Sequence, residues 1–197
     1  MIQLPVWVFV VLSILIIAFV AFATWAYLTA QRLHRMHKRV DQAAISLAGS
    51  LDRRAVAVRG VARSMRRIAE EIAVAEPERA ALIEADADAL NSATELAEEV
   101  DVYQPQQLIE REKVENEITL LLRRTDFSFI ERDETEELQD AVSRVALARR
   151  FYNSAVREAI SLHNAPLIRA LHLAGRAPQP QFFNIVEGTE PYAAESG

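Results

Sequence analysis

The chain opens with a run over residues 2–29 that contains no charged side chain and is rich in Val, Ile, Leu, Phe and Ala. A hydrocarbon core about 30 Å thick needs about 20 apolar residues in a helix, and this run is longer. Trp7 lies near one end of the run, and Trp25 lies near the other, where aromatic rings favour the headgroup region. The pattern predicts a transmembrane helix. We assign residues 1–31 to a membrane anchor that contacts lipid through residues 2–29.

Positive charge follows the apolar run and does not precede it. Four basic residues come directly after the run: Arg32, Arg35, Lys38 and Arg39. Because cytoplasmic flanks collect Lys and Arg, we expect the N-terminus outside and the remainder in the cytoplasm, at the cell inner or plasma membrane. A cleaved signal peptide is the alternative, since Ala21-Phe22-Ala23 resembles a cleavage site. Signal peptides, however, have a basic segment before a shorter apolar stretch.

After the anchor, apolar residues recur at alternating spacings of three and four. The positions are Val40, Ala44, Leu47, Leu51, Arg54, Val58, Val61, Met65, Ile68 and Ile72. This spacing is typical of a helix that packs along other helices at a small crossing angle. The pattern predicts one helix that continues from the anchor to about Ala75, with Arg54 as the single charged residue on its apolar seam.

Prolines divide the rest of the chain into further helices, because proline fits the first turn of a helix but not its interior. A second helix is predicted from Pro77 to about Val100, with an apolar face formed by Leu82, Ala85, Ala89, Ala93, Leu96 and Val100. A third is predicted from Pro105, with Leu108, Ile118, Leu121 and Leu122 as its apolar members.

The pattern breaks over residues 125–132, where we expect Phe127 and Phe129 to be exposed. A fourth helix is predicted from there to about His163, followed by a short helical segment over residues 167–174. The predicted fold class is all-α: a single N-terminal transmembrane helix followed by an antiparallel bundle of about four long helices. The bundle is expected over residues 32–175, and a flexible tail over 176–197.

The residue composition excludes several kinds of functional site. The chain contains no cysteine, which excludes disulfides, thiolate metal sites and a cysteine nucleophile. It contains 5 glycines, too few and too scattered for a nucleotide-binding loop. The net charge is −6, with basic residues on the first bundle helix and acidic residues on the next two. Exposed ion pairs contribute under about 1 kcal/mol each, so we interpret most of these charges as solvated faces.

Two strings carry a resemblance to a known family. Leu-Asp-Arg-Arg-Ala at 51–55, and Arg-Val-Ala-Leu-Ala-Arg-Arg-Phe-Tyr-Asn-Ser-Ala-Val at 144–156, resemble the signatures of the LemA family of membrane-anchored bacterial proteins. The resemblance implies an antiparallel helical bundle on an anchor whose N-terminus is outside. The chain departs from the family's pattern in two places. Val56, Arg59 and Gly60 stand where an acidic residue and Pro-Asn are usual, and Val142 stands where Glu is common. The resemblance therefore predicts the architecture of this chain better than its biochemical activity.

The candidate structural or interaction residues are Arg53, Arg54, Arg149, Arg150, Tyr152 and Asn153. Arg54 is costly on an apolar seam unless it is paired. We expect a buried ion pair with Glu112 or Glu115, or a contact with the Tyr152 hydroxyl. The alternative is contact with an anion or a partner peptide. Tyr152 is expected in the core, and Asn153 is expected to cap or cross-link helices.

Catalytic and metal-binding chemistry is not visible in the pattern. His34 and His37 have a spacing that can hold a metal, but a third ligand is missing nearby. We therefore predict no cofactor, no catalysis and no nucleic-acid partner. The expected function is that of a cell-envelope scaffold or adaptor with an unidentified protein partner. The alternatives left open are a regulatory subunit of a membrane protease or synthase, and a homo-oligomer.

Overall fold

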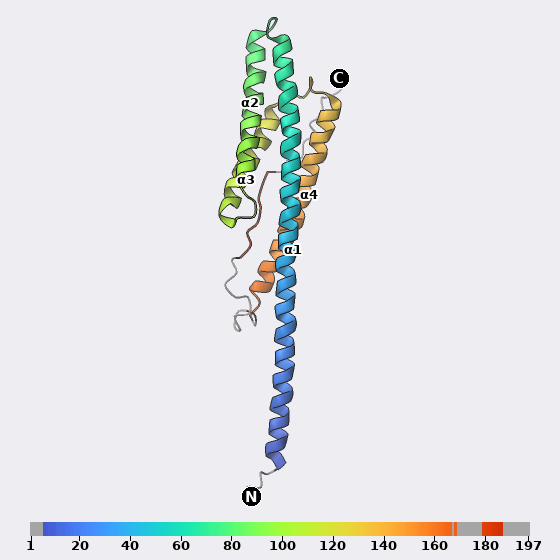
Figure 1. Cartoon of the computed structure of the whole chain (residues 1–197), viewed down its shortest axis with the longest axis vertical. Coiled ribbons are helices and arrows are strands. Elements are labelled where there is room, and N and C mark those ends of the chain that lie inside the picture. Colours follow the sequence, from blue (N-terminus) through green and yellow to red (C-terminus); the bar gives the residue numbers. More distant parts are fainter. Residues whose placement is uncertain (1–5, 167, 169–178, 187–197) are drawn as a thin grey trace.

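A computed structural model describes residues 6–166, 168 and 179–186. It contains four helices: α1 (Val6–Ile72), α2 (Pro77–Glu99), α3 (Pro105–Arg124) and α4 (Arg132–His163). No strand occurs among the described residues, which confirms the predicted all-helical fold class. In Figure 1, α1 forms the long axis of the molecule and the other helices gather around its second half.

The first part of α1 projects beyond the other helices (Figure 1). Its apolar side chains, such as Phe9, Ile14, Ile17 and Phe19, are exposed along its whole circumference. By length and composition, α1 is the one helix in the described part of the chain that is able to cross a membrane. This part of α1 packs against no other described helix and is apolar on all sides. Such a helix is expected to face lipid.

The second part of α1 is the centre of the bundle, with α2 packed on one side and α4 on another. The predicted seam is confirmed: Leu47, Leu51, Val58 and Val61 are completely buried, and Met65 is buried beside them. The helix continues without interruption from the projecting part through Ile72. The long seam thus organises the whole core.

The apolar face predicted for α2 is only partly correct: Ala93 is buried and Ala89 packs against the core, but the predicted leucines do not. Leu82 is 69% exposed and Leu96 is also exposed, whereas Ile83, Ala87 and Leu90 are buried against α1. Alanine and leucine occur on several faces of α2, so periodicity alone did not select one. The face that packs is lined largely by alanines, whose small side chains permit close approach to α1.

The loop between α3 and α4 is also different from the prediction. Phe127 is only 8% exposed and belongs to the apolar cluster that contains Leu122 and Leu138, and Phe129 packs partly against it. The Asp126 carboxylate accepts a hydrogen bond from the Ser128 main-chain N–H at 2.9 Å. This Asx turn bends the chain so that Phe127 points inward. A local period break therefore marked a turn and not an exposed surface.

Residues 179–186 are extended and pack against α3 and α4. The sequence predicts a flexible tail from residue 176 onward, whereas Phe183 is completely buried and Ile185 is nearly so. Both side chains join the apolar cluster of Leu51, Val145 and Tyr152. The helical segment predicted for residues 167–174 lies outside the described residues, apart from Ile168.

Charged residues join neighbouring elements at the surface. On α1, Arg66 pairs with Asp88 of α2 at 2.8 Å, and Arg59 pairs with Glu98 of α2. Arg67 pairs at 3.0 Å with Glu131, just before α4. All these side chains are at least 30% exposed, so each pair contributes under about 1 kcal/mol. The apolar seam, and not the charge pattern, stabilises the bundle.

Candidate interaction site

Side chains of α4 hold the 179–186 segment by its main chain. The Tyr152 hydroxyl donates to the Gln181 carbonyl at 2.9 Å. The Asn153 side-chain amide donates to the Phe183 carbonyl and accepts from the Phe183 N–H, both at 2.9 Å. One asparagine thus satisfies both main-chain groups of one residue. Asn153 was predicted to cap or cross-link helices, but it instead binds the main chain of the 179–186 segment.

Side chains of α3 bind the same segment from the other side. The Glu112 carboxylate accepts a hydrogen bond from the Asn184 N–H at 2.6 Å, and the Asn116 side-chain oxygen accepts one from the Val186 N–H at 2.7 Å. Glu112 and Asn116 lie one helical turn apart. We call Glu112, Asn116, Tyr152 and Asn153 together the segment-binding site.

Side chains of the bound segment alternate as in a strand. Phe183 and Ile185 point into the core, whereas Phe182, Asn184 and Val186 are exposed. Successive side chains of an extended chain point to opposite sides, which explains this period of two. The Arg157 guanidinium lies 5.9 Å from the centre of the exposed Phe182 ring, in cation–π range.

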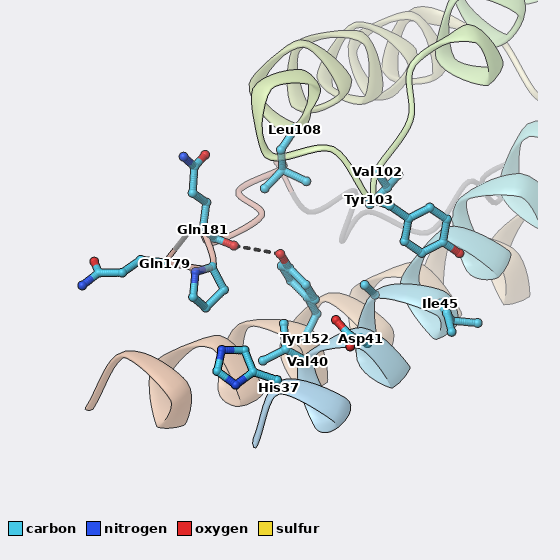
Figure 2. A pocket seen from close by; sticks show the side chains of 12 residues that line it. His37, Val40, Asp41, Ile45, Val102, Tyr103, Leu108, Tyr152, Gln179 and Gln181 are labelled. Carbon is cyan, nitrogen blue, oxygen red and sulfur yellow. Dashed lines mark hydrogen bonds between the residues drawn. The ribbon is translucent and has the colours of Figure 1, made fainter. Parts of the chain in front are cut away.

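A pocket of about 620 Å³ lies beside the start of this segment. Figure 2 shows His37, Val40 and Asp41 of α1 on one side, Tyr103 and Leu108 opposite, and Gln179 and Gln181 closing it. The Tyr152 hydroxyl points from α4 toward the Gln181 carbonyl at its edge (Figure 2). The volume is in the range of small-molecule sites. Apolar side chains form most of the lining, and the residues named for it include no Ser, Thr, Cys or Lys.

Burial raises the pKa of the Tyr152 phenol, and the nearby Glu112 carboxylate raises it further. Both causes disfavour the phenolate. Tyr152 therefore remains a neutral hydrogen-bond donor at physiological pH. This is the protonation state required by its bond to the Gln181 carbonyl.

A separate buried network surrounds Arg54, which is 3% exposed. Its guanidinium lies 3.2 Å from the Glu115 carboxylate and donates to the Glu115 carbonyl at 2.9 Å. It also donates to the Thr119 hydroxyl at 3.4 Å. The expected ion pair is therefore present with Glu115. Glu112 instead binds the 179–186 segment, and the Tyr152 hydroxyl binds Gln181.

Arg111 completes the network, and the sequence pattern did not reveal it. Its Nε donates to the second Glu115 carboxylate oxygen at 2.8 Å, and its Nη1 donates to the carbonyls of Ala97 and Val100 at the end of α2. Arg111 is four residues before Glu115 on α3, a spacing that brings helix side chains together. Two arginines share one carboxylate, and the network joins α1, α2 and α3.

Arg53 lies on a different surface from Arg54. It lines a shallow groove of about 390 Å³ between α1 and α4, together with Ile45, Gly49, Leu147 and Phe151. Ile45, Leu147 and Phe151 are exposed, and Phe151 is 63% exposed. A Cβ added to Gly49 would meet nothing within 4 Å, so the groove is open there. We call this surface the α1–α4 groove.

The six predicted residues are thus distributed over separate places. Tyr152 and Asn153 belong to the segment-binding site, Arg54 to the buried network and Arg53 to the α1–α4 groove. On α4, Arg149 is half-buried and Arg150 is exposed. Among the residues that the structure describes, no group of three or more His, Asp or Glu side chains is placed to hold a metal ion.

Three comparisons were made with known proteins. No family model, no curated protein and no solved structure matches the chain.

Proposed function

We propose that this chain is a single-pass membrane protein whose antiparallel helical bundle binds other proteins on the cytoplasmic side, as a scaffold or adaptor of the cell envelope. The observation that carries the proposal is the α1–α4 groove. Apolar side chains scattered singly over a surface are ordinary, whereas contiguous ones mark interaction sites. Here Ile45, Leu147 and Phe151 line one open groove.

The chemistry of the groove suggests the class of partner. Aromatic and aliphatic side chains at the centre, with arginines at the edge, are typical of protein interfaces. Arg53 and Arg144 lie beside the apolar residues of the groove. We therefore expect a partner surface with apolar residues flanked by acidic ones.

The projecting part of α1 supports the membrane part of the proposal. It is exposed and apolar, and Arg32, Arg35, Lys38 and Arg39 follow it. Positive residues on one flank favour the cytoplasm for that side. The similarity of residues 144–156 to the LemA signature supports the same arrangement, because that family is membrane-anchored and helical.

Photo-cross-linking in cells tests the proposal. A photoreactive residue in place of Phe151 should give a recurrent adduct with one foreign protein, identified by mass spectrometry. The control carries the same residue in place of Glu84, which is exposed on α2 away from the groove. Identical adduct patterns from the two positions, or none from Phe151, would contradict a docking role for the groove. An adduct with a membrane protease or synthase would favour the regulatory-subunit alternative.

A further inference from the structure

We propose that the segment-binding site is a binding site for an extended peptide, and that the 179–186 segment of a second copy of this chain occupies it in exchange for the chain's own segment. The inference rests on the proposed function, since it names one class of partner for the bundle. It concerns a different surface from the α1–α4 groove, so the two can be tested separately.

The site recognises the backbone of its occupant. Tyr152 binds a main-chain carbonyl, and Asn153 binds both main-chain groups of Phe183. Glu112 and Asn116 each accept a hydrogen bond from a main-chain N–H. Every peptide offers these groups, and only an extended one offers them at this spacing. Recognition of an extended backbone with pockets for alternate side chains is an established mode of peptide binding.

Side-chain selectivity comes from the two inward positions. Phe183 is completely buried, and Ile185 is nearly so. The residue between them points outward and contributes only its main-chain N–H. The ligand class is therefore an extended peptide with an aromatic residue and an aliphatic residue two positions later.

A second copy is the occupant that fits this description. Each copy carries the matching sequence, Gln-Pro-Gln-Phe-Phe-Asn-Ile-Val over 179–186. Residues 169–178 connect this segment to Ile168, and ten extended residues reach at most about 35 Å. A bundle two helices thick is about 20–24 Å across, which is less than this reach, so the connection is long enough to cross to a neighbouring bundle. Confinement to one membrane raises the effective concentration, and reciprocal exchange gives a closed dimer.

Two full-length variants test the exchange: an acceptor, whose own segment is weakened, and a donor, whose own segment-binding site is weakened. The acceptor carries Asn184→Pro, which removes the N–H of its own segment that bonds to Glu112 and leaves all four residues of its segment-binding site unchanged. The donor carries Asn153→Ala, which removes both bonds to Phe183 and leaves its own segment intact. The donor also carries benzoylphenylalanine in place of Phe182, which faces Arg157 of α4. The acceptor and the donor carry different affinity tags. They are reconstituted together in vesicles of phosphatidylcholine and phosphatidylglycerol and then irradiated.

We expect donor–acceptor adducts to exceed donor–donor adducts at least about tenfold, the factor expected from losing two hydrogen bonds in the donor's own site. A free peptide with the sequence of residues 179–186 should suppress the adduct. The same peptide with Phe183→Ala should not. A matched donor with the photoreactive residue in place of exposed Leu82 on α2 should give only background.

Equal donor–donor and donor–acceptor yields would overturn the proposal. Peptide binding to the acceptor without a donor–acceptor adduct would also overturn it, because the occupant would then not be a second copy. Circular dichroism checks that the acceptor is folded. If Asn184→Pro prevents folding, Val186→Pro replaces it, since this change removes the N–H bonded to Asn116. The two results that would overturn the exchange do not alter the adducts expected at Phe151. The proposed function would therefore stand even if the exchange proposal failed.

Discussion

Two arginines and one glutamate determine how α1, α2 and α3 meet. Glu115 is almost completely buried and receives Arg54 on one oxygen and Arg111 on the other. A buried charge without a partner costs several kcal/mol, whereas a matched group of charges specifies a single arrangement. We therefore interpret the network as a device that fixes the register between the three helices.

Removal of Arg54 should be far more damaging than removal of its neighbour. Arg54→Ala leaves Thr119 and part of the Glu115 carboxylate without a donor inside the core, so we expect a loss of about 3–5 kcal/mol in the free energy of unfolding. Arg53→Ala alters an exposed side chain, so we expect a change within about 0.5 kcal/mol. Denaturant unfolding of the detergent-solubilised chain measures both. Equal, small losses would place Arg54 outside the energetic core.

The Tyr152 phenol should make stability sensitive to alkali. Its pKa is raised in the folded chain by burial and by Glu112. The folded state thus holds the proton more tightly than the unfolded state does. The resulting stabilisation is complete below the unfolded pKa of about 10 and is lost as the pH rises through the higher folded pKa.

Denaturant unfolding at about pH 8 and about pH 10.5 measures this effect, because these values lie on either side of the unfolded pKa. We expect the free energy of unfolding to fall more in the wild-type chain than in Tyr152→Phe, which has no phenolic proton. The decrease in the free energy of unfolding that remains in Tyr152→Phe is due to all the other titrating groups. Parallel losses in the two proteins would show that the phenol is not buried.

At the scale of elements, the sequence predicted a helix best where its apolar positions fell on a single face. The α1 seam has one such face, and all its members pack as expected. On α2, alanines and leucines surround the helix, and the face that packs includes Ala89 and Ala93 of the predicted face but not Leu82 or Leu96. Burial of Arg111 could not be read from a pattern of apolar residues either, since it depends on Glu115 and on the carbonyls at the end of α2.

The α3–α4 loop should behave as part of the core. Phe127→Ala removes a buried ring from the cluster that contains Leu122 and Ile130, so we expect a loss of about 3–5 kcal/mol in the free energy of unfolding. Leu82→Ala on α2 is the matched control, because that side chain is exposed, and it should change stability by under about 0.5 kcal/mol. Thermal and denaturant unfolding compare the two. A small effect of Phe127→Ala would restore the exposed loop predicted from the sequence.

At the scale of the molecule, long-range contacts were the least predictable feature. Residues 179–186 contain no charged residue, and the prolines in this part of the chain, such as Pro178 and Pro180, suggested a tail. Their position depends on Glu112, Asn116 and Asn153, which are about 30 to 70 residues away and polar. Tyr152 and Asn153 were recognised as candidates from the sequence, but their ligand was not, because periodicity describes single helices and not what two helices hold between them.

The central proposal is that residues 2–29 span a membrane and that the bundle lies on the cytoplasmic side. The absence of native cysteine permits a direct test with two single-cysteine variants, Gln3→Cys at the N-terminal end of the span and Glu84→Cys on exposed α2. Intact cells are treated with a maleimide that cannot cross the inner membrane. We predict that Gln3→Cys is labelled at once and that Glu84→Cys is labelled only after the membrane is permeabilised. Labelling of Glu84→Cys in intact cells, or release of either variant in the soluble fraction, would contradict the account.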